Sequence, residues 1–224
     1  DVARARDLPG VVAVLTGADL AGAMGRSLSD RHLLARDTVR YVGEPVVVIA
    51  AVSPEVAEQA ASLVSVAYEM LPAVLDSVSG LAAGATLVHP QLETYARAAH
   101  VSPQPGANIA HRCAQSRGDL EHGWSQATVI LEHTYTVPPV QHVTMEPHGG
   151  VAQEEPDGRI TLWASTQAPL AQRDLIAQAL DLDPERVRLV TPFVGGGFGG
   201  KTFVSIEALL VALAMRTGGR PVKL

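Results

Sequence analysis

The sequence predicts an α+β fold built from two units. In residues 1–76, short β-branched runs flank a single helical stretch, which is the order of a small mixed domain. Residues 118–224 again alternate runs of period 2 with runs of period 3.6. Between them, residues 77–117 are rich in Ser, Gly, Ala, Pro and Gln and keep neither period. We expect this stretch to be an extended connector that packs along a surface.

The composition excludes several classes of protein. The chain has 224 residues, of which 47% are hydrophobic and 18% charged, so it contains enough apolar material for a sizeable core. Its net charge of −6 argues against nucleic-acid binding, which needs a basic surface. Cys113 is the single cysteine, which excludes an internal disulfide framework and a CxxC motif and favours a cytoplasmic location. No apolar run reaches the roughly 20 residues that span a bilayer, so we expect no membrane association.

The first unit is expected to contain two strands, a helix and a closing extended segment. The strands are residues 11–15 and 39–52, the second of them broken around Gly43. A helix should begin after Ser53, because this serine is a good N-cap and is followed by proline and then glutamate. Residues 64–71 should return to extended structure.

The second unit should combine helices with one sheet and a glycine loop. In chain order we expect helix 118–125, strand 127–137, strand 158–166, helix 168–180, strand 186–193 and helix 203–216. The three strands should form one sheet. The last helix is apolar nearly all round, so it should be buried inside a larger body. The chain begins at Asp1 and Leu224 falls in what looks like the start of a strand. We therefore expect a fragment of a longer polypeptide.

The glycine loop has the sequence GGGFGGKT (195–202), which satisfies the P-loop expression GxxxxGK[ST]. A P-loop cradles phosphates with its backbone N–H groups and would direct Lys201 to the terminal ones. However, only 22 residues follow Thr202, and none forms an apolar strand ending in Asp that would hold magnesium. Five of the six residues 195–200 are glycine and the other is Phe198, a pattern typical of backbone lying close to a flat ligand. Contact with a cofactor is the preferred interpretation; a P-loop and a simple chain turn remain alternatives.

Several segments, taken in order, resemble one family: the molybdenum-binding large subunit of xanthine dehydrogenase, aldehyde oxidase and carbon monoxide dehydrogenase. STQ (165–167) followed about thirty residues later by GGGFGGK is a more specific pair than either motif alone. The segments that resemble the family's N-terminal hammerhead α/β domain are PGVVAVLTGADL (9–20), VRYVGEPVVVIAA (39–51) and residues 60–76. Those that resemble the first part of its molybdopterin-binding α+β region are GDLEHGWSQATVILEHTY (118–135), HVTMEP (142–147), GRITLWASTQAP (158–169), ERVRLV (185–190), VGGGFGGK (194–201) and GRPVKL (219–224).

The resemblance implies roles for five residues. The side-chain amide of Gln167 would hydrogen-bond an oxygen on molybdenum, and Phe198 would lie beside the metal and the substrate; these two are the expected catalytic residues. The backbone N–H groups of Gly196, Gly197 and Phe198 would contact the metal's oxo group and the pterin dithiolene, and Gly199 would complete the cofactor-binding loop. Because the cofactor holds its metal through its own sulfurs, no residue is expected to ligate the metal.

The resemblance also implies a function. The parent enzyme would be a molybdenum hydroxylase or dehydrogenase that oxidises an aldehyde, an N-heterocycle or a similar small substrate. Its cofactor would be molybdenum–molybdopterin, in the plain or the cytosine dinucleotide form. Electrons would pass to iron–sulfur clusters and FAD on partner subunits or domains, and the large subunit would form a dimer. The general-base glutamate would lie beyond Leu224, so the fragment alone should be inactive. Thr202 stands where purine-oxidising members have glutamate, which argues against xanthine. A cofactor-free interaction subunit with the same fold remains an alternative.

Other polar residues invite weaker hypotheses. His142, Glu146 and His148 are close in sequence, but their spacing is not HExxH, so a turn at Glu146 is expected instead of a metal site. Glu44 is expected to have a packing or turn role, and Trp163 to be an interior strand residue. Cys113 is expected to be inert.

Overall fold

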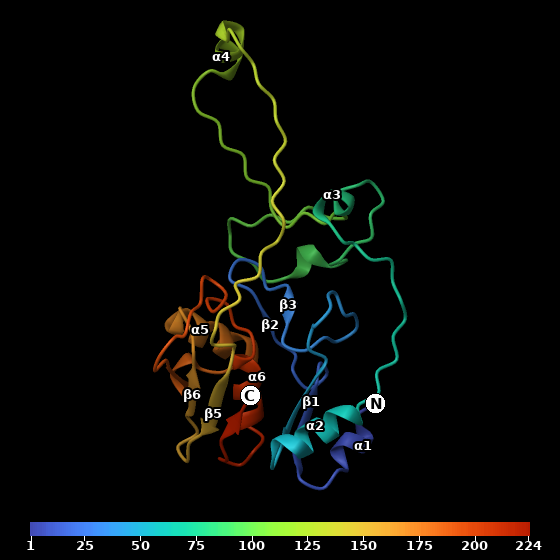
Figure 1. Cartoon of the computed structure of the whole chain (residues 1–224), viewed down its shortest axis with the longest axis vertical. Helices are drawn as coiled ribbons and strands as arrows, with labels where there is room; N and C mark the ends of the chain where they lie inside the picture. The colour runs from blue at the N-terminus through green and yellow to red at the C-terminus, as the bar shows by residue number, and fades with distance from the viewer.

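The computed structural model describes residues 1–224 and shows a first unit of two small hairpin-like sheets and two helices. β1 and β4 pair antiparallel, as do β2 and β3, and α1 and α2 pack beside β1 and β4 (Figure 1). The elements are α1 (Ala3–Arg6), β1 (Val11–Thr16), β2 (Ala23–Met24), β3 (Arg31–His32), β4 (Val47–Ala51) and α2 (Pro54–Ser62). The predicted strand 11–15 and the helix after Ser53 are confirmed, and the Ser53 hydroxyl accepts a hydrogen bond from the Val56 N–H at 3.4 Å.

The predicted extended segments of this unit are confirmed only in part. In the stretch 39–52, which was expected to break around Gly43, the strand after the break is confirmed as β4 from Val47, whereas the residues before the break form a turn and no strand. In that turn the Glu44 carboxylate accepts a hydrogen bond from the Arg40 N–H at 2.5 Å, and Gly43 has a φ of +91°. Glu44 therefore shapes a turn, as expected. Residues 64–71 are not a strand either, since no neighbouring strand pairs with them.

Residues 77–110 form an irregular layer above β2 and β3 (Figure 1). Its short helical segments are α3 (Ser77–Gly80) and η1 (Leu92–Thr94), and a bridge joins Leu28 to Arg97. Leu92 and Val101 are buried, which fixes the layer to the body. No strand runs through these residues, and the division of the chain into units 1–76, 77–117 and 118–224 stays a prediction.

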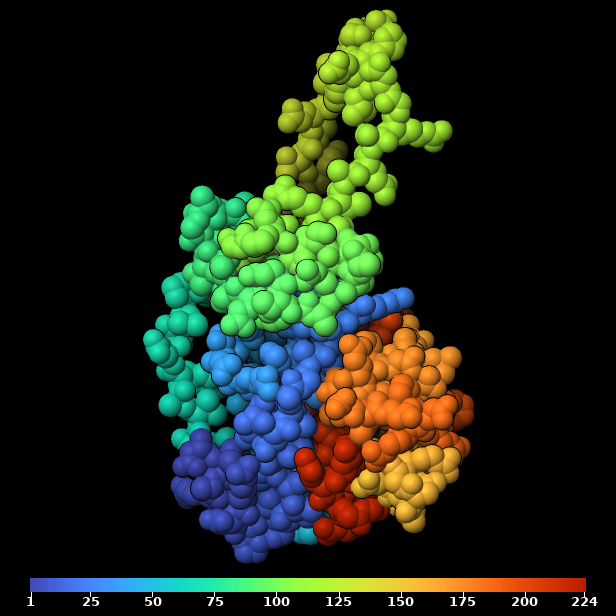
Figure 2. Space-filling model, turned by 180° about the vertical axis from the view of Figure 1, so that it is seen from behind, coloured from blue at the N-terminus to red at the C-terminus, as the bar shows by residue number.

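Residues 111–143, which we call the arm, extend away from the body and return to it beside the glycine loop, where the His142 ring lies near Gly200. Every residue of the arm is exposed, and the space-filling view shows it as a thin projection (Figure 2). At its tip is α4 (Leu120–Gln126), whose N-cap Asp119 accepts a hydrogen bond from the His122 N–H at 2.9 Å, so the predicted helix 118–125 is confirmed. The predicted strand 127–137 was wrong: these residues alternate as a strand does, but no other strand in the chain lies beside them.

The second sheet has four strands in the order β7-β6-β5-β8. β6 pairs antiparallel with β5 and parallel with β7, and α5 makes the crossover between the two parallel strands. The elements are β5 (Gly150–Glu154), β6 (Ile160–Ala164), α5 (Pro169–Leu180), η2 (Pro184–Arg186), β7 (Val187–Val190), α6 (Glu207–Ala214) and β8 (Val222–Lys223). Strands 158–166 and 186–193 and helix 168–180 are confirmed in shortened form. β5 takes the place in the sheet that was expected for residues 127–137.

The core is common to both units. Twenty-two buried residues form one cluster, which includes Leu15 and Val48 of the first unit and Leu162 and Leu210 of the second. α6 lies at its centre, with all eight of its residues buried, as predicted for an all-round apolar helix. It is shorter than the predicted 203–216, and the Phe203 carbonyl, outside the helix, accepts a hydrogen bond from the Gln172 side-chain amide at 2.9 Å. No helix of the chain is both long and apolar enough to cross a bilayer.

Candidate functional site

Two chain segments far apart in sequence meet at one edge of the second sheet. β6 and β7 are parallel neighbours, so their carboxyl ends lie at the same edge, where open sheets bind ligands. Gln167 follows β6 by three residues, and the glycine loop, residues 195–200, follows β7. The topology therefore brings together the two motifs that the sequence singled out.

Gln167 is in direct contact with the glycine loop. Its side-chain oxygen accepts a hydrogen bond from the Gly199 N–H at 3.0 Å, and its own N–H donates to the Lys201 carbonyl at 3.0 Å. A Cβ atom at Gly197 would lie 2.3 Å from the Gln167 side-chain oxygen, so only glycine allows this approach. Gln167 and Phe198 thus belong to one site although 31 positions separate them.

Phe198 points outward from the loop. It adopts a left-handed backbone conformation with φ +49°, which is uncommon for a bulky residue, between Gly196 at +96° and Gly199 at +90°. Its side chain is 73% exposed. The ring is therefore available to contact a bound molecule and takes no part in the core.

The site is rich in hydrogen-bond donors that have no protein acceptor. The backbone N–H groups of Gly196, Gly197 and Phe198 donate to no protein atom, although Gly197 is buried. The side-chain NH₂ of Gln167 is also unpaired, since only its oxygen is used by the loop. Of these residues only Gly197 is buried, and buried N–H groups without partners are rare in folded proteins. This donor set fits an oxygen-rich, anionic group such as the molybdopterin cofactor.

Beneath the loop lies a charged network that we call the Glu146 clasp. One oxygen of the Glu146 carboxylate accepts three hydrogen bonds: from the Gly195 N–H at 2.7 Å, the Lys201 ammonium at 2.6 Å and the Ser165 hydroxyl at 2.6 Å. Lys201 also donates to the Ser165 hydroxyl at 3.1 Å. The bonds from Lys201, Ser165 and Gly195 lower the pKa of the Glu146 carboxyl from 4.5 to about 2, so the group is ionised at neutral pH.

The clasp removes the lysine that a P-loop requires. The Lys201 side chain is fully buried, and its ammonium is held between Glu146 and Ser165, so it cannot extend to a phosphate on the outer side of the loop. In the P-loop alternative this lysine would meet the terminal phosphates. The geometry therefore does not support nucleotide binding by residues 195–202.

Sequence reasoning overlooked the clasp. It assigned Glu146 only a turn and considered Lys201 only as a phosphate ligand, while Ser165 was noted solely as part of the STQ motif. Nothing in sequence spacing links Glu146 to Lys201, which lies 55 positions away. The available signal was chemical: a lysine beside an apolar helix must be paired when it is buried.

The remaining candidates take no part in the clasp. The His142 ring lies near Gly200, where an added Cβ would approach it to 3.0 Å, and His148 lies 3.9 Å from the buried Glu207 carboxylate. With Glu146 engaged by Lys201, these three residues do not gather into a metal site. Trp163 is 38% exposed, so its expected interior position was wrong. Cys113 is exposed in the arm.

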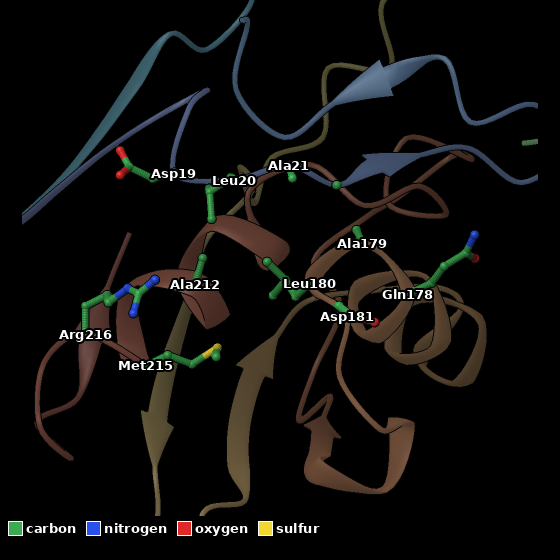
Figure 3. Close-up of a pocket in the computed structure, with 11 residues that line it drawn as sticks. Asp19, Leu20, Ala21, Gln178, Ala179, Leu180, Asp181, Ala212, Met215 and Arg216 are labelled. Carbon is green, nitrogen blue, oxygen red and sulfur yellow. The ribbon is translucent and has the colours of Figure 1, made fainter. Parts of the chain in front are cut away.

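A separate cavity of about 390 Å³ lies between the two units (Figure 3). Residues 19–22 of the first unit form one wall, and the ends of α5 and α6 form the other, with Arg216 at the rim. α5 starts beside Gln167 and reaches this cavity only at its last residues, 178–180. The cavity is therefore not part of the glycine-loop site.

Comparison with known proteins agrees with this geometry. The profile of the molybdopterin cofactor-binding domain matches residues 101–224, and that of the aldehyde oxidase and xanthine dehydrogenase a/b hammerhead domain matches residues 1–72. The fold and site therefore define a molybdopterin cofactor-binding protein. The chain belongs to this family, and its first 72 residues are the hammerhead domain that accompanies it in aldehyde oxidases and xanthine dehydrogenases.

Individual relatives extend the similarity over the whole chain. The xanthine dehydrogenase molybdenum-binding subunit of Escherichia coli is 34% identical over 98% of this chain and 29% of its own length. The aldehyde oxidoreductase molybdenum-binding subunit of the same species is 33% identical over 100% of this chain and 28% of its own. The structure of carbon monoxide dehydrogenase from Oligotropha carboxidovorans superimposes with a TM-score of 0.83 at 29% identity, covering 100% of this chain and 28% of that one. This chain thus spans little more than a quarter of the relatives' length.

Proposed function

We propose that the chain is the first part of the molybdenum-binding large subunit of a molybdenum hydroxylase. The single observation that carries the proposal is the contact between Gln167 and the glycine loop, with four donor groups left unpaired around it. Family membership supports the cofactor class, and the donor set supports its location at this edge of the sheet.

When bound, the cofactor supplies two-electron oxidation of a carbon centre with oxygen taken from water. In our proposal this chain binds and orients that group. The amides of Gly196, Gly197 and Phe198 and the side-chain NH₂ of Gln167 donate hydrogen bonds to its oxygen and sulfur atoms, and Gly199 keeps Gln167 in place. The exposed Phe198 ring lines one side of the substrate space and excludes water there.

The finer details follow from the same proposal. The substrate is an aldehyde, an N-heterocycle or a similar small molecule, and Thr202, beside the loop, disfavours xanthine. The cofactor is molybdenum–molybdopterin, in the plain or the cytosine dinucleotide form, and iron–sulfur and flavin centres on partner subunits or domains accept the electrons. Two copies of the large subunit form a dimer in the cytoplasm, and the general-base glutamate lies outside these 224 residues.

The test uses the full-length subunit, co-expressed with its partners. We expect about one molybdenum per large subunit by elemental analysis. Gln167→Ala should lower turnover at least tenfold while changing the melting temperature little, because Gln167 is exposed and contributes no core contact. The matched control is Gln178→Ala, an exposed glutamine on the far end of α5, which should leave turnover unchanged. A subunit that purifies folded and without molybdenum would instead support the cofactor-free interaction subunit.

A further inference from the structure

We propose that Glu146 and Lys201 are positioning residues for the glycine loop: their ion pair ties both ends of the loop to the end of β6 and so fixes where the loop amides stand. This inference rests on the proposed function for its catalytic consequence. The mechanical part, that the pair holds the loop, stands on geometry alone.

The clasp joins three separate stretches of chain at one atom. The Glu146 carboxylate oxygen takes its hydrogen bonds from Ser165, just after β6, and from Gly195 and Lys201, at the start and the end of the loop. The segment between the two ends contains all three unpaired backbone donors. The spacing of the two loop ends is therefore set by a common acceptor that belongs to neither strand.

Lys201 is an anchor on both its side chain and its backbone. Its carbonyl accepts hydrogen bonds from the Gln167 N–H, the Thr166 hydroxyl and the Gln172 side-chain amide at 3.0, 3.1 and 3.1 Å. Its ammonium is fully buried with Glu146 as its anionic partner. Because a buried, unpaired ammonium is strongly unfavourable, the observed loop conformation, in which the Lys201 ammonium is buried, requires an ionised Glu146.

The close approach of the loop to Glu146 adds a steric requirement. A Cβ atom at Gly195 would lie 2.6 Å from the Glu146 Cβ, so the backbone rests directly on this side chain. Without the clasp, the start of the loop would keep the bond from the Glu146 N–H to the Gly195 carbonyl at 3.2 Å, and its middle would keep the bond from Gly199 to Gln167 and its own internal turns. Donors that must meet a cofactor need positions fixed to a fraction of an ångström. The clasp therefore acts on the cofactor through the loop and not by contact.

The two charges should not be equivalent when removed singly. Glu146→Gln leaves Lys201 buried without a counter-charge, whereas Lys201→Met leaves a carboxylate that is 40% exposed and can be hydrated. Glu146→Gln should therefore have the larger effect. The double variant Glu146→Gln/Lys201→Met removes both charges, so it should fold well but still lack the tie between the loop ends.

The experiment compares these variants in the full-length subunit with its partners. The matched control is Glu154→Gln, which breaks an ion pair with Arg186 of 3.6 Å in the same unit, away from the loop. The first readout is hydrogen–deuterium exchange of the bonded loop amides at residues 195, 199 and 200 in cofactor-free protein. The second is turnover divided by bound molybdenum, which a loss of folded protein alone does not change.

For Glu146→Gln we expect exchange at least tenfold faster at these amides and turnover per molybdenum at least tenfold lower, with Lys201→Met affected less and Glu154→Gln unchanged. If Glu146→Gln does not fold, the double variant decides: faster loop exchange and lower turnover per molybdenum support positioning. Wild-type values for both readouts in a folded Glu146→Gln or double variant would overturn the inference. A wild type without molybdenum would refute the proposed function, and loop exchange would still decide whether the clasp holds the loop.

Discussion

The strand-like segment 127–137 of the arm and helix α6 both carry runs of apolar side chains, but they lie in opposite environments. All eight residues of α6 are buried, and the helix contacts β5, β6 and β8 of its own sheet as well as β4 of the first unit. All residues of the arm are exposed, including Leu131 at 76%, and the arm extends away from the body (Figure 1). The difference shows that an apolar pattern forms a packed element only where a second surface covers it.

The largest expected effect is a difference in the free energy of unfolding between a substitution in α6 and the same substitution in the arm. Leu210→Ala in α6 should lower the free energy of unfolding by about 2–5 kcal/mol, because the side chain is fully buried and its loss leaves a cavity. The matched change Leu131→Ala in the arm should alter it by less than about 0.5 kcal/mol. Urea unfolding of the purified chain measures both. Equal losses would mean that the arm packs on the body in solution.

Two glycines give a second comparison. Gly197→Ala should destabilise the chain by about 1–3 kcal/mol, since the added methyl would overlap the Gln167 side chain at 2.3 Å. Gly123→Ala, within α4 of the arm, has open space around it and should favour the helix by up to about 1 kcal/mol. Thermal unfolding and far-ultraviolet circular dichroism report the two effects. A harmless Gly197→Ala would show that Gln167 does not rest on the loop.

Limited proteolysis should distinguish the arm from the body. Trypsin should cut after Arg112 and Arg117 at least about tenfold faster than after Arg186, whose side chain is bound to the Gly158 carbonyl. Mass spectrometry of early fragments gives the order of cleavage. The same digestion of the full-length subunit sharpens the comparison, because protection of both arm sites there would show that the arm packs against the part of the subunit outside these residues.

The smallest expected effect is a pH dependence of the clasp. The folded pKa of Glu146 is lowered from 4.5 to about 2, so its contribution to stability is fully present above pH 4.5 and is lost as the pH falls toward 2. In the Glu146→Gln variant the side chain at position 146 carries no charge at any pH. The difference in unfolding free energy between wild type and this variant should therefore shrink over that interval, as measured by denaturant titration at several pH values. A constant difference would contradict an ionised clasp.

Local sequence signals correctly predicted the elements whose formation does not depend on long-range contacts. Ser53 followed by proline and glutamate fixes the start of α2, and Asp119 fixes the start of α4 even though that helix packs on nothing. The STQ and glycine motifs indicated the candidate site because their pairing resembles that of the molybdenum-binding large subunits. Their proximity followed once β6 and β7 proved to be parallel neighbours.

The wrong predictions share a cause: whether a segment pairs with another depends on residues far away in the sequence. Residues 127–137 have the alternation of a strand and no partner, whereas β5, with only one buried residue among its five, occupies the sheet. The clasp was missed for the same reason, since Glu146 and Lys201 are matched by the fold and not by any spacing. Long-range contacts of this kind leave no periodic mark in a single sequence.

The common core has a practical consequence for engineering. Leu15 and Val48 of the hammerhead domain share one apolar cluster with Leu162 and Leu210 of the cofactor-binding domain. A chimera that exchanged residues 1–72 for those of a relative would place foreign side chains directly against α6. Such a hybrid should need compensating substitutions on α6 before it folds stably. Replacement of arm residues alone should need none.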